Sequence, residues 1–128
     1  MIVGAAIVRG HALLAQQRAY PREVAGLWEL PGGRVEQGET ERAALRRECV
    51  EELGVEVHVG DRVGPTVTLR AGLVLKVYAA RLADPSAEPK PLEHNGLRWI
   101  DGSSLDSVQW LPADLELLPH LRGLLGAH

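Results

Sequence analysis

The stretch that decides the fold is GRVEQGETERAALRRECVEELGV, residues 33–55. Thr40 can cap the first turn of a helix with its hydroxyl oxygen. Gly54 supplies a stop, because glycine readily adopts the left-handed conformation that ends helices. Neither proline nor glycine stands between these two positions. The sequence therefore predicts a helix over about 40–53.

This helix gathers four acids on one side. With about 100° per residue and Glu48 at zero, Glu41, Glu51 and Glu52 fall with it in a sector about 100° wide. Like charges at these spacings repel one another, and more strongly when they are desolvated. The arc beside them is the expected core side of the helix, formed by Ala43, Leu45, Cys49, Val50 and Leu53.

Two explanations fit the acidic sector: a solvated surface, which is the usual meaning of such a stripe, or a bound divalent cation. Oxygen ligands without clustered His or Cys favour a hard ion such as Mg²⁺ or Mn²⁺. The preceding loop, Leu30-Pro31-Gly32-Gly33, favours the cation, because two glycines let the backbone approach a ligand closely.

The whole stretch resembles the Nudix box, Gly-x5-Glu-x7-Arg-Glu-U-x-Glu-Glu-x-Gly-U, where U is a bulky aliphatic residue. Gly33, Glu39 and the run from Arg47 to Val55 occupy every fixed position with the spacing intact. Cys49, at a position that is usually Ile, Leu or Val, is the one mild departure. The chain is thus identified as similar to Nudix hydrolases.

The resemblance implies an α/β fold, an α/β/α sandwich with a central mixed sheet and a C-terminal helix. It also implies divalent-metal-dependent hydrolysis of a nucleoside diphosphate linked to another group. Glu48 and Glu52 would be the primary metal ligands, with Glu51 sharing a further ion and the Gly32 carbonyl completing one coordination sphere. Glu39 would bond Arg47 and hold the helix against the loop, so both are counted with the catalytic residues.

Further residues resemble the MutT-like branch, which includes 8-oxo-dGTP and CTP pyrophosphohydrolases. Arg18 stands where these enzymes place an arginine near the triphosphate. Glu93 matches an acid that approaches the metals from another loop, as a ligand or as the base for the attacking water; the alternative is a surface loop acid. Asp114, in Trp110-Leu111-Pro112-Ala113-Asp114, matches a residue over the nucleobase, or it simply favours the first turn of a helix through the helix dipole.

An ionised Asp114 would only accept hydrogen bonds and so would favour a base that presents an N–H. Guanine shows the N7 and O6 acceptors on its major-groove edge, whereas cytosine offers its N4 amino group. Oxidation at C8 converts N7 of guanine into an N–H donor. Asp114 therefore fits 8-oxo-dGTP and CTP or dCTP, and it argues against plain GTP.

The rest of the chain predicts mainly strands around this helix. Pro112 should open the last helix and Pro119 should interrupt it. The expected strands are 2–8, 12–17, 27–30, 63–69, 73–82 and 96–100, with a β-rich start at 55–59, a helical turn at 101–106 and a helix at 113–125.

Composition narrows the class of protein. The 128 residues suit a single domain, 1–128, and a net charge of −3 disfavours stable nucleic-acid binding. Apolar runs are too short for a membrane span, and the single cysteine excludes an internal disulfide. We expect a cytoplasmic protein, monomeric or homodimeric, that acts on a small nucleotide.

The sequence thus predicts a MutT-like enzyme that hydrolyses (deoxy)nucleoside triphosphates to the monophosphate and pyrophosphate in nucleotide-pool sanitation. Two alternatives remain open at this point. One is a Nudix hydrolase of ADP-ribose or another nucleoside diphosphate derivative. The other is a non-catalytic, nucleotide-sensing Nudix module.

Overall fold

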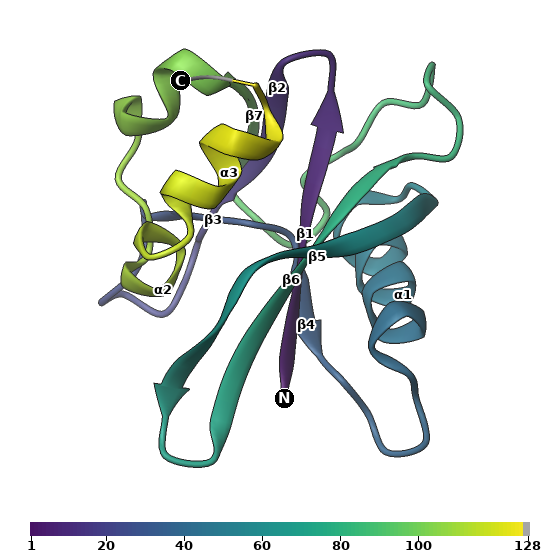
Figure 1. Cartoon of the computed structure of the whole chain (residues 1–128), viewed down its shortest axis with the longest axis vertical. Coiled ribbons are helices and arrows are strands. Elements are labelled where there is room, and N and C mark those ends of the chain that lie inside the picture. The colour runs from purple at the N-terminus through teal and green to yellow at the C-terminus, as the bar shows by residue number, and fades with distance from the viewer. Residues whose placement is uncertain (127–128) are drawn as a thin grey trace.

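The centre of the fold is β1 (Ile2–Arg9), as Figure 1 shows for the computed structural model, which describes residues 1–126. A strand with an almost continuous apolar sequence is typical of a sheet that is covered on both faces. Val3, Ala5 and Ile7 pack into one hydrophobic core, and Ala6 packs into a second core on the opposite face. The alternation of side chains along β1 therefore separates two cores.

The sheet is mixed and has seven strands. β1 runs parallel to β6 and antiparallel to β2 and β4, and the main strand order is β3-β2-β1-β6-β5, with β4 paired to β1 and β7 to β2. The remaining elements are β2 (Ala12–Gln17), β3 (Trp28–Glu29), β4 (Gly32–Arg34), α1 (Glu41–Leu53), β5 (Val57–Arg70), β6 (Leu73–Leu82), β7 (Gly96–Asp101), the 3-10 helix η1 (Gly102–Ser107), α2 (Pro112–Leu115) and α3 (Leu118–Leu124).

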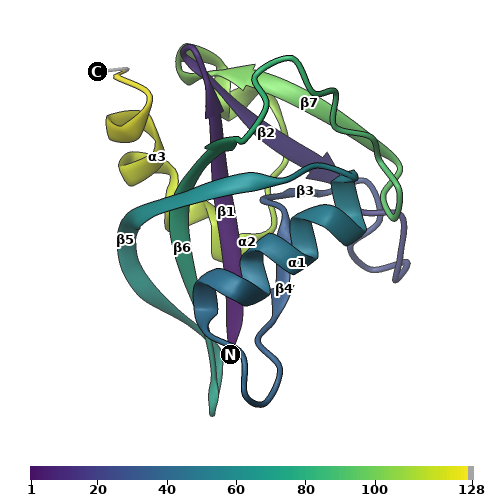
Figure 2. The ribbon, with the colours of Figure 1, turned by 90° about the vertical axis from the view of Figure 1, so that its right-hand side faces the viewer.

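Helices cover the two faces of the sheet. Figures 1 and 2 show α1 on one side of β1 and the pair α2 and α3 on the other. Leu45, Cys49 and Leu53 of α1 fill the first core, whereas Leu117 and Leu121 fill the second. This arrangement confirms the α/β/α sandwich. Among the helices of residues 1–126, none combines the length and apolar character that a bilayer crossing requires.

The boundaries of α1 are confirmed, but its predicted buried face is partly wrong. Thr40 caps the helix by accepting a hydrogen bond from the Ala43 amide, and Gly54 ends it with a φ of 69°. Val50, predicted to be buried, is 48% exposed, while Glu52 is only 3% exposed. The face that packs against the sheet therefore includes one of the acids, which apolar periodicity does not reveal.

The strands differ from the prediction in two respects. The strand β4 was not expected, and β5 is one continuous strand in which bulges join the two predicted segments. The C-terminal helix is divided into α2 and α3, as the interruption at Pro119 predicts, with Pro112 and Pro119 each in the first turn of its helix. Proline fits there because the first turn needs no amide donor.

Candidate active site

A cavity of about 150 Å³ lies where α1, β4 and two loops meet. It is bounded by residues that follow β2, by the first residue of β4, by acids of α1 and by the loop that precedes β7. Its lining comprises Arg18, Ala19, Tyr20, Gly32, Glu48, Glu52, Glu93 and His94. Four of the predicted metal-binding residues therefore line one cavity: Gly32, Glu48, Glu52 and Glu93.

Close backbone approach at β4 makes this geometry possible. Gly33 pairs with Val3 of β1 and directly faces Glu48 of α1. A Cβ atom at Gly33 would lie 2.6 Å from each Glu48 carboxyl oxygen. Gly32 has a φ of 155°, and a Cβ there would collide with the Val3 carbonyl. Only glycine therefore leaves room for the carboxylate beside this strand.

Glu52 is buried at the inner end of the cavity. Its Oε2 accepts a hydrogen bond from Gln16 Nε2 at 2.5 Å, and its Oε1 accepts one from the Gly32 amide at 3.2 Å. Burial raises the pKa of Glu52 to about 7, against the lowering effect of Gln16 and of His94. A buried carboxylate of this kind favours a nearby positive charge.

Arg47 connects the acids of the stretch that contains the Nudix pattern. Its Nε and Nη2 donate to the two Glu39 carboxyl oxygens at 2.8 and 3.0 Å, so the Glu39–Arg47 contact expected from the resemblance is present. Nη1 donates to Glu48 at 2.9 Å, and Nη2 also donates to the Arg34 carbonyl at 3.0 Å. The bond to Arg47 lowers the pKa of Glu39 to about 2. Burial raises the pKa of Glu48, which Arg47 opposes.

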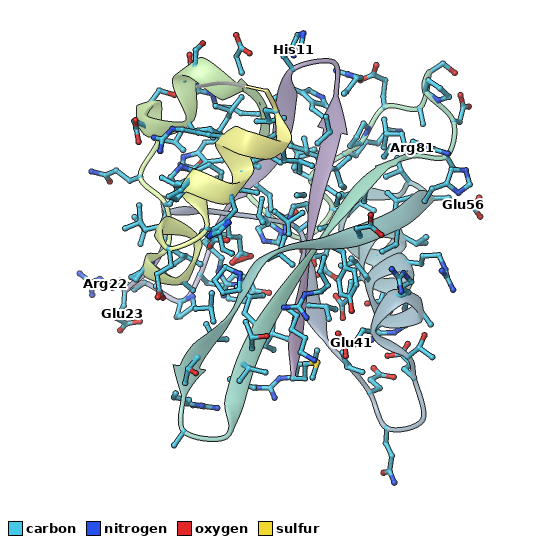
Figure 3. The ribbon with its side chains drawn as sticks, viewed as in Figure 1. His11, Arg22, Glu23, Glu41, Glu56 and Arg81 are labelled. Atoms are coloured by element: carbon cyan, nitrogen blue, oxygen red, sulfur yellow. The ribbon has the colours of Figure 1, made fainter. Side chains whose placement is uncertain are left out.

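The other two acids of the predicted sector lie apart from the cavity. The Glu51 side chain is 50% exposed and lies 3.3 Å from Arg47 Nη1. Glu41, labelled in Figure 3, accepts hydrogen bonds from the Tyr78 hydroxyl at 2.7 Å and from Lys76 Nζ at 3.4 Å. The role of Glu51 toward a further ion therefore stays a prediction.

The residues of the cavity suit a hard divalent cation. They offer carboxylate oxygens and a glycine that leaves room for Glu48. Within residues 1–126, no three His, Cys, Asp or Glu side chains are gathered closely enough to hold a metal ion as they stand. Instead, Arg47 donates a hydrogen bond to Glu48, and Gln16 donates one to Glu52.

Three polar residues at this site were missed by the sequence analysis. Gln16 is fully buried in β2, and His94 has only 8% of its side chain exposed. His94 Nε2 lies 3.1 Å from Glu29 Oε2. A glutamine within an apolar strand was the available signal for Gln16, whereas nothing in the sequence pattern distinguished Glu29 or His94.

A second cavity, of about 240 Å³, adjoins the first and shares Arg18 and Gly32 with it. Its walls are mainly apolar, with four charged residues among them. The lining is Ile2, Val3, Arg18, Glu29, Leu30, Gly32, Gly33, Arg34, Leu69, Leu75, Val77, Leu111, Ala113 and Asp114. Arg18 stands at the junction, where its Nη1 lies 3.4 Å from Glu29 and its Nη2 donates to the Tyr20 carbonyl.

Asp114 lines this second cavity in a buried environment. It is 5% exposed, and burial, followed by the charge of Glu29, raises its pKa to about 8. Burial thus works against the ionised, acceptor-only form of Asp114 that the sequence led us to expect. Tyr20 is 68% exposed beside the first cavity.

Comparisons with known proteins agree with this geometry. The family model described as "NUDIX domain" matches residues 1–122. The chain is 49% identical over 117 residues to "Putative 8-oxo-dGTP diphosphatase 2" of Mycobacterium tuberculosis, covering 89% of this chain and 82% of that protein. It is 35% identical over 126 residues to "CTP pyrophosphohydrolase" of Escherichia coli, covering 98% and 93%. The solution structure of the E. coli ORF135 protein superposes with a TM-score of 0.81 at 35% identity, covering 96% and 88%.

Proposed function

Because the chain belongs to the Nudix family, we propose that it hydrolyses nucleoside triphosphates to the monophosphate and pyrophosphate, with 8-oxo-dGTP and CTP or dCTP as preferred substrates. It is a MutT-like Nudix hydrolase by similarity to relatives named for these two activities.

One observation carries the proposal: an acidic cavity and a largely apolar cavity adjoin and share Arg18 and Gly32. A nucleoside triphosphate has the same division, since an apolar base is joined to a polyanion. The base fits the cavity that contains Asp114, and the phosphates fit the acidic cavity once cations are present. Arg18 at the junction offers guanidinium donors that suit phosphate oxygens.

Mg²⁺ is the proposed cofactor, with Mn²⁺ as the alternative. When bound, divalent ions neutralise the polyphosphate and activate water. Glu48, Glu52, Glu93 and the Gly32 carbonyl would hold them, and Glu51 would contribute after a rotation of its exposed side chain. In this proposal Glu93 serves either as a ligand or as the base that takes a proton from the attacking water.

Arg47 and Glu39 act on the acids rather than on the substrate. Arg47 bonds Glu48, Glu39 and the Arg34 carbonyl together, which fixes the middle of α1 against the loop after β4. Gln16 and the Gly32 amide fix both oxygens of Glu52. These contacts orient the carboxylates before the substrate arrives.

A protonated Asp114 explains how one pocket suits two different bases. A neutral carboxyl group donates one hydrogen bond and accepts another. 8-Oxoguanine places the N7–H donor beside the O6 acceptor, and cytosine places its N4 donor beside the N3 acceptor. The same edge of guanine carries two acceptors, N7 and O6, of which a neutral carboxyl group can satisfy only one.

The proposed setting is the cytoplasm, with the enzyme a monomer or homodimer that binds no nucleic acid stably. The net charge of −3 supports the last point, because affinity for nucleic acids depends largely on neutralising phosphates with basic residues.

A substrate panel tests the proposal: 8-oxo-dGTP, dCTP, CTP, 5-methyl-dCTP, dGTP and ADP-ribose, scored by pyrophosphate and monophosphate release. We expect the highest kcat/KM for 8-oxo-dGTP or a cytosine nucleotide, and none without divalent metal. Faster hydrolysis of dGTP than of all these substrates would refute the account of Asp114. Preference for ADP-ribose would refute the proposed substrate class.

A further inference from the structure

The last part of the loop between β6 and β7 is held by backbone hydrogen bonds on either side of Glu93 and His94. The Leu92 amide donates to the Glu52 carbonyl at 3.1 Å, and the Asn95 amide donates to the Gln17 carbonyl at 3.0 Å. The first bond joins the loop to the end of α1 and the second joins it to the end of β2. Glu93 and His94 lie between these two bonds.

Glu93 depends on this loop for its position. Among the described residues, 1–126, it makes no side-chain hydrogen bond or ion pair, although it lines the acidic cavity. His94, by contrast, is turned inward, with 8% of its side chain exposed. Glu93 thus faces the cavity without a side-chain partner, whereas the side chain of His94 is buried beneath it.

His94 is held by one direct contact. Its Nε2 lies 3.1 Å from Glu29 Oε2, and because a carboxylate accepts, Nε2 donates. Glu29 belongs to β3 and lies 3.4 Å from Arg18. His94 Nδ1 lies 3.7 Å from Glu52 Oε2, beyond a hydrogen bond, and is buried without a partner. The ring therefore fills the space between β3 and Glu52.

We propose that His94 is a positioning residue for hydrolysis: its bond to Glu29 fixes the loop so that Glu93 faces Glu48 and Glu52 across the cavity. This inference rests on the proposed function in one respect, namely that Glu93 serves the reaction. Glu29 of β3 also lines the second cavity, which is proposed to hold the base. Through His94, the same strand would help to position Glu93 in the first cavity, which is proposed to hold the phosphates.

Three substitutions at one position test the bond. His94→Gln keeps an N–H near the position of Nε2, whereas His94→Asn reaches only the position of Nδ1 and His94→Ala removes both. We expect Ala and Asn to lower kcat at least about tenfold with little change in KM, as for other residues that orient a ligating side chain. Gln should recover most of the loss. Asn95→Ala, an exposed neighbour in the same loop, is the control and should leave kcat unchanged.

A double-mutant cycle tests whether His94 acts through Glu93. In a Glu93→Gln background, His94→Ala should cause little further loss of kcat. An equal loss in both backgrounds would overturn the inference, as would full activity of His94→Ala alone.

Two measurements do not depend on turnover. Amide hydrogen exchange at Leu92 and Asn95 should be faster in His94→Ala than in the wild type and should return to the wild-type rate in His94→Gln; unchanged exchange in His94→Ala would overturn the inference. Mn²⁺ added to the protein should give the same ¹⁴N coupling by electron spin echo in the wild type and in His94→Ala. A coupling that is present in the wild type and lost in His94→Ala would make His94 a metal ligand and overturn the inference. If the wild type hydrolysed no nucleotide, the proposed function would fail, while the exchange measurement would still decide the role of His94.

Discussion

Replacing Asp114 with Asn should make the stability of the protein less dependent on pH. The pKa of Asp114 rises from 3.8 to about 8 in the folded protein, first because of burial and then because of Glu29. A raised carboxyl pKa contributes stability that is complete below the unfolded value and is lost as pH rises to the folded value. Asn cannot ionise, so Asp114→Asn should escape this loss.

The size of the effect follows from the two pKa values. Their difference corresponds to at most about 6 kcal/mol, of which about 4 kcal/mol falls between pH 5 and pH 9. Relaxation around a buried charge and water penetration reduce this figure, so it is an upper bound. The other charged residues that line the same cavity, Arg18, Glu29 and Arg34, are present in both proteins, so the comparison isolates the change at position 114.

Urea unfolding of both proteins at pH 5, 7 and 9 provides the measurement. The stability of Asp114→Asn minus that of the wild type should increase with pH and become constant above about pH 8. Asp61→Asn, which removes an exposed carboxylate from β5, is the matched control and should show a nearly constant difference. A pH-independent difference for Asp114→Asn would refute the claim that Asp114 is neutral when buried. The same variant should keep its activity on 8-oxo-dGTP, since an amide also donates and accepts.

Three further predictions concern the acidic cavity. Glu52→Gln should abolish turnover while nucleotide binding, measured by calorimetry, persists, which separates catalysis from mere nucleotide sensing. Gly33→Ala should weaken Mn²⁺ binding at least about tenfold, because the new methyl group displaces the Glu48 carboxylate; Gly96→Ala, which has open space, should not. Arg47→Lys should lower the free energy of unfolding by about 2 kcal/mol and reduce kcat, because lysine cannot reproduce the forked contacts of Arg47.

Each of these three predictions has a result that would refute it. Turnover by Glu52→Gln near the wild-type rate would remove Glu52 from the reaction. Equal Mn²⁺ affinity in the two alanine variants would show that the Glu48 carboxylate does not bind the ion. Wild-type stability and activity of Arg47→Lys would show that the geometry of the guanidinium contributes little.

The part of the fold that depends on local chemistry could be predicted from the sequence. The Thr40 cap and the Gly54 stop set the limits of α1, and Pro119 marked the division of the last helix. Strands with long apolar runs were also found, because such runs indicate burial on both faces of a sheet. The short strand β4 was not, since two glycines and an arginine carry no strand signal.

The candidate site was predictable only where the residues belong to a spaced motif. Apolar periodicity placed Val50 inside and left Glu52 outside, and both positions are reversed. The reason is that Glu52 has buried donors, Gln16 and the Gly32 amide, on strands that the helix sequence does not describe. The raised pKa of Asp114 could not be foreseen for a similar reason, because it depends on burial in the tertiary structure.

The central place of β1 has a consequence for folding kinetics. This strand leaves the ribosome before its parallel neighbour β6, residues 73–82, with which it makes its longest run of pairing. Pairings of such long sequence separation slow folding, because loop-closure entropy is lost before the contacts form. The edge of this apolar strand that pairs with β6 thus stays open during synthesis, and chaperone binding or aggregation should concentrate on residues 2–9 of the nascent chain.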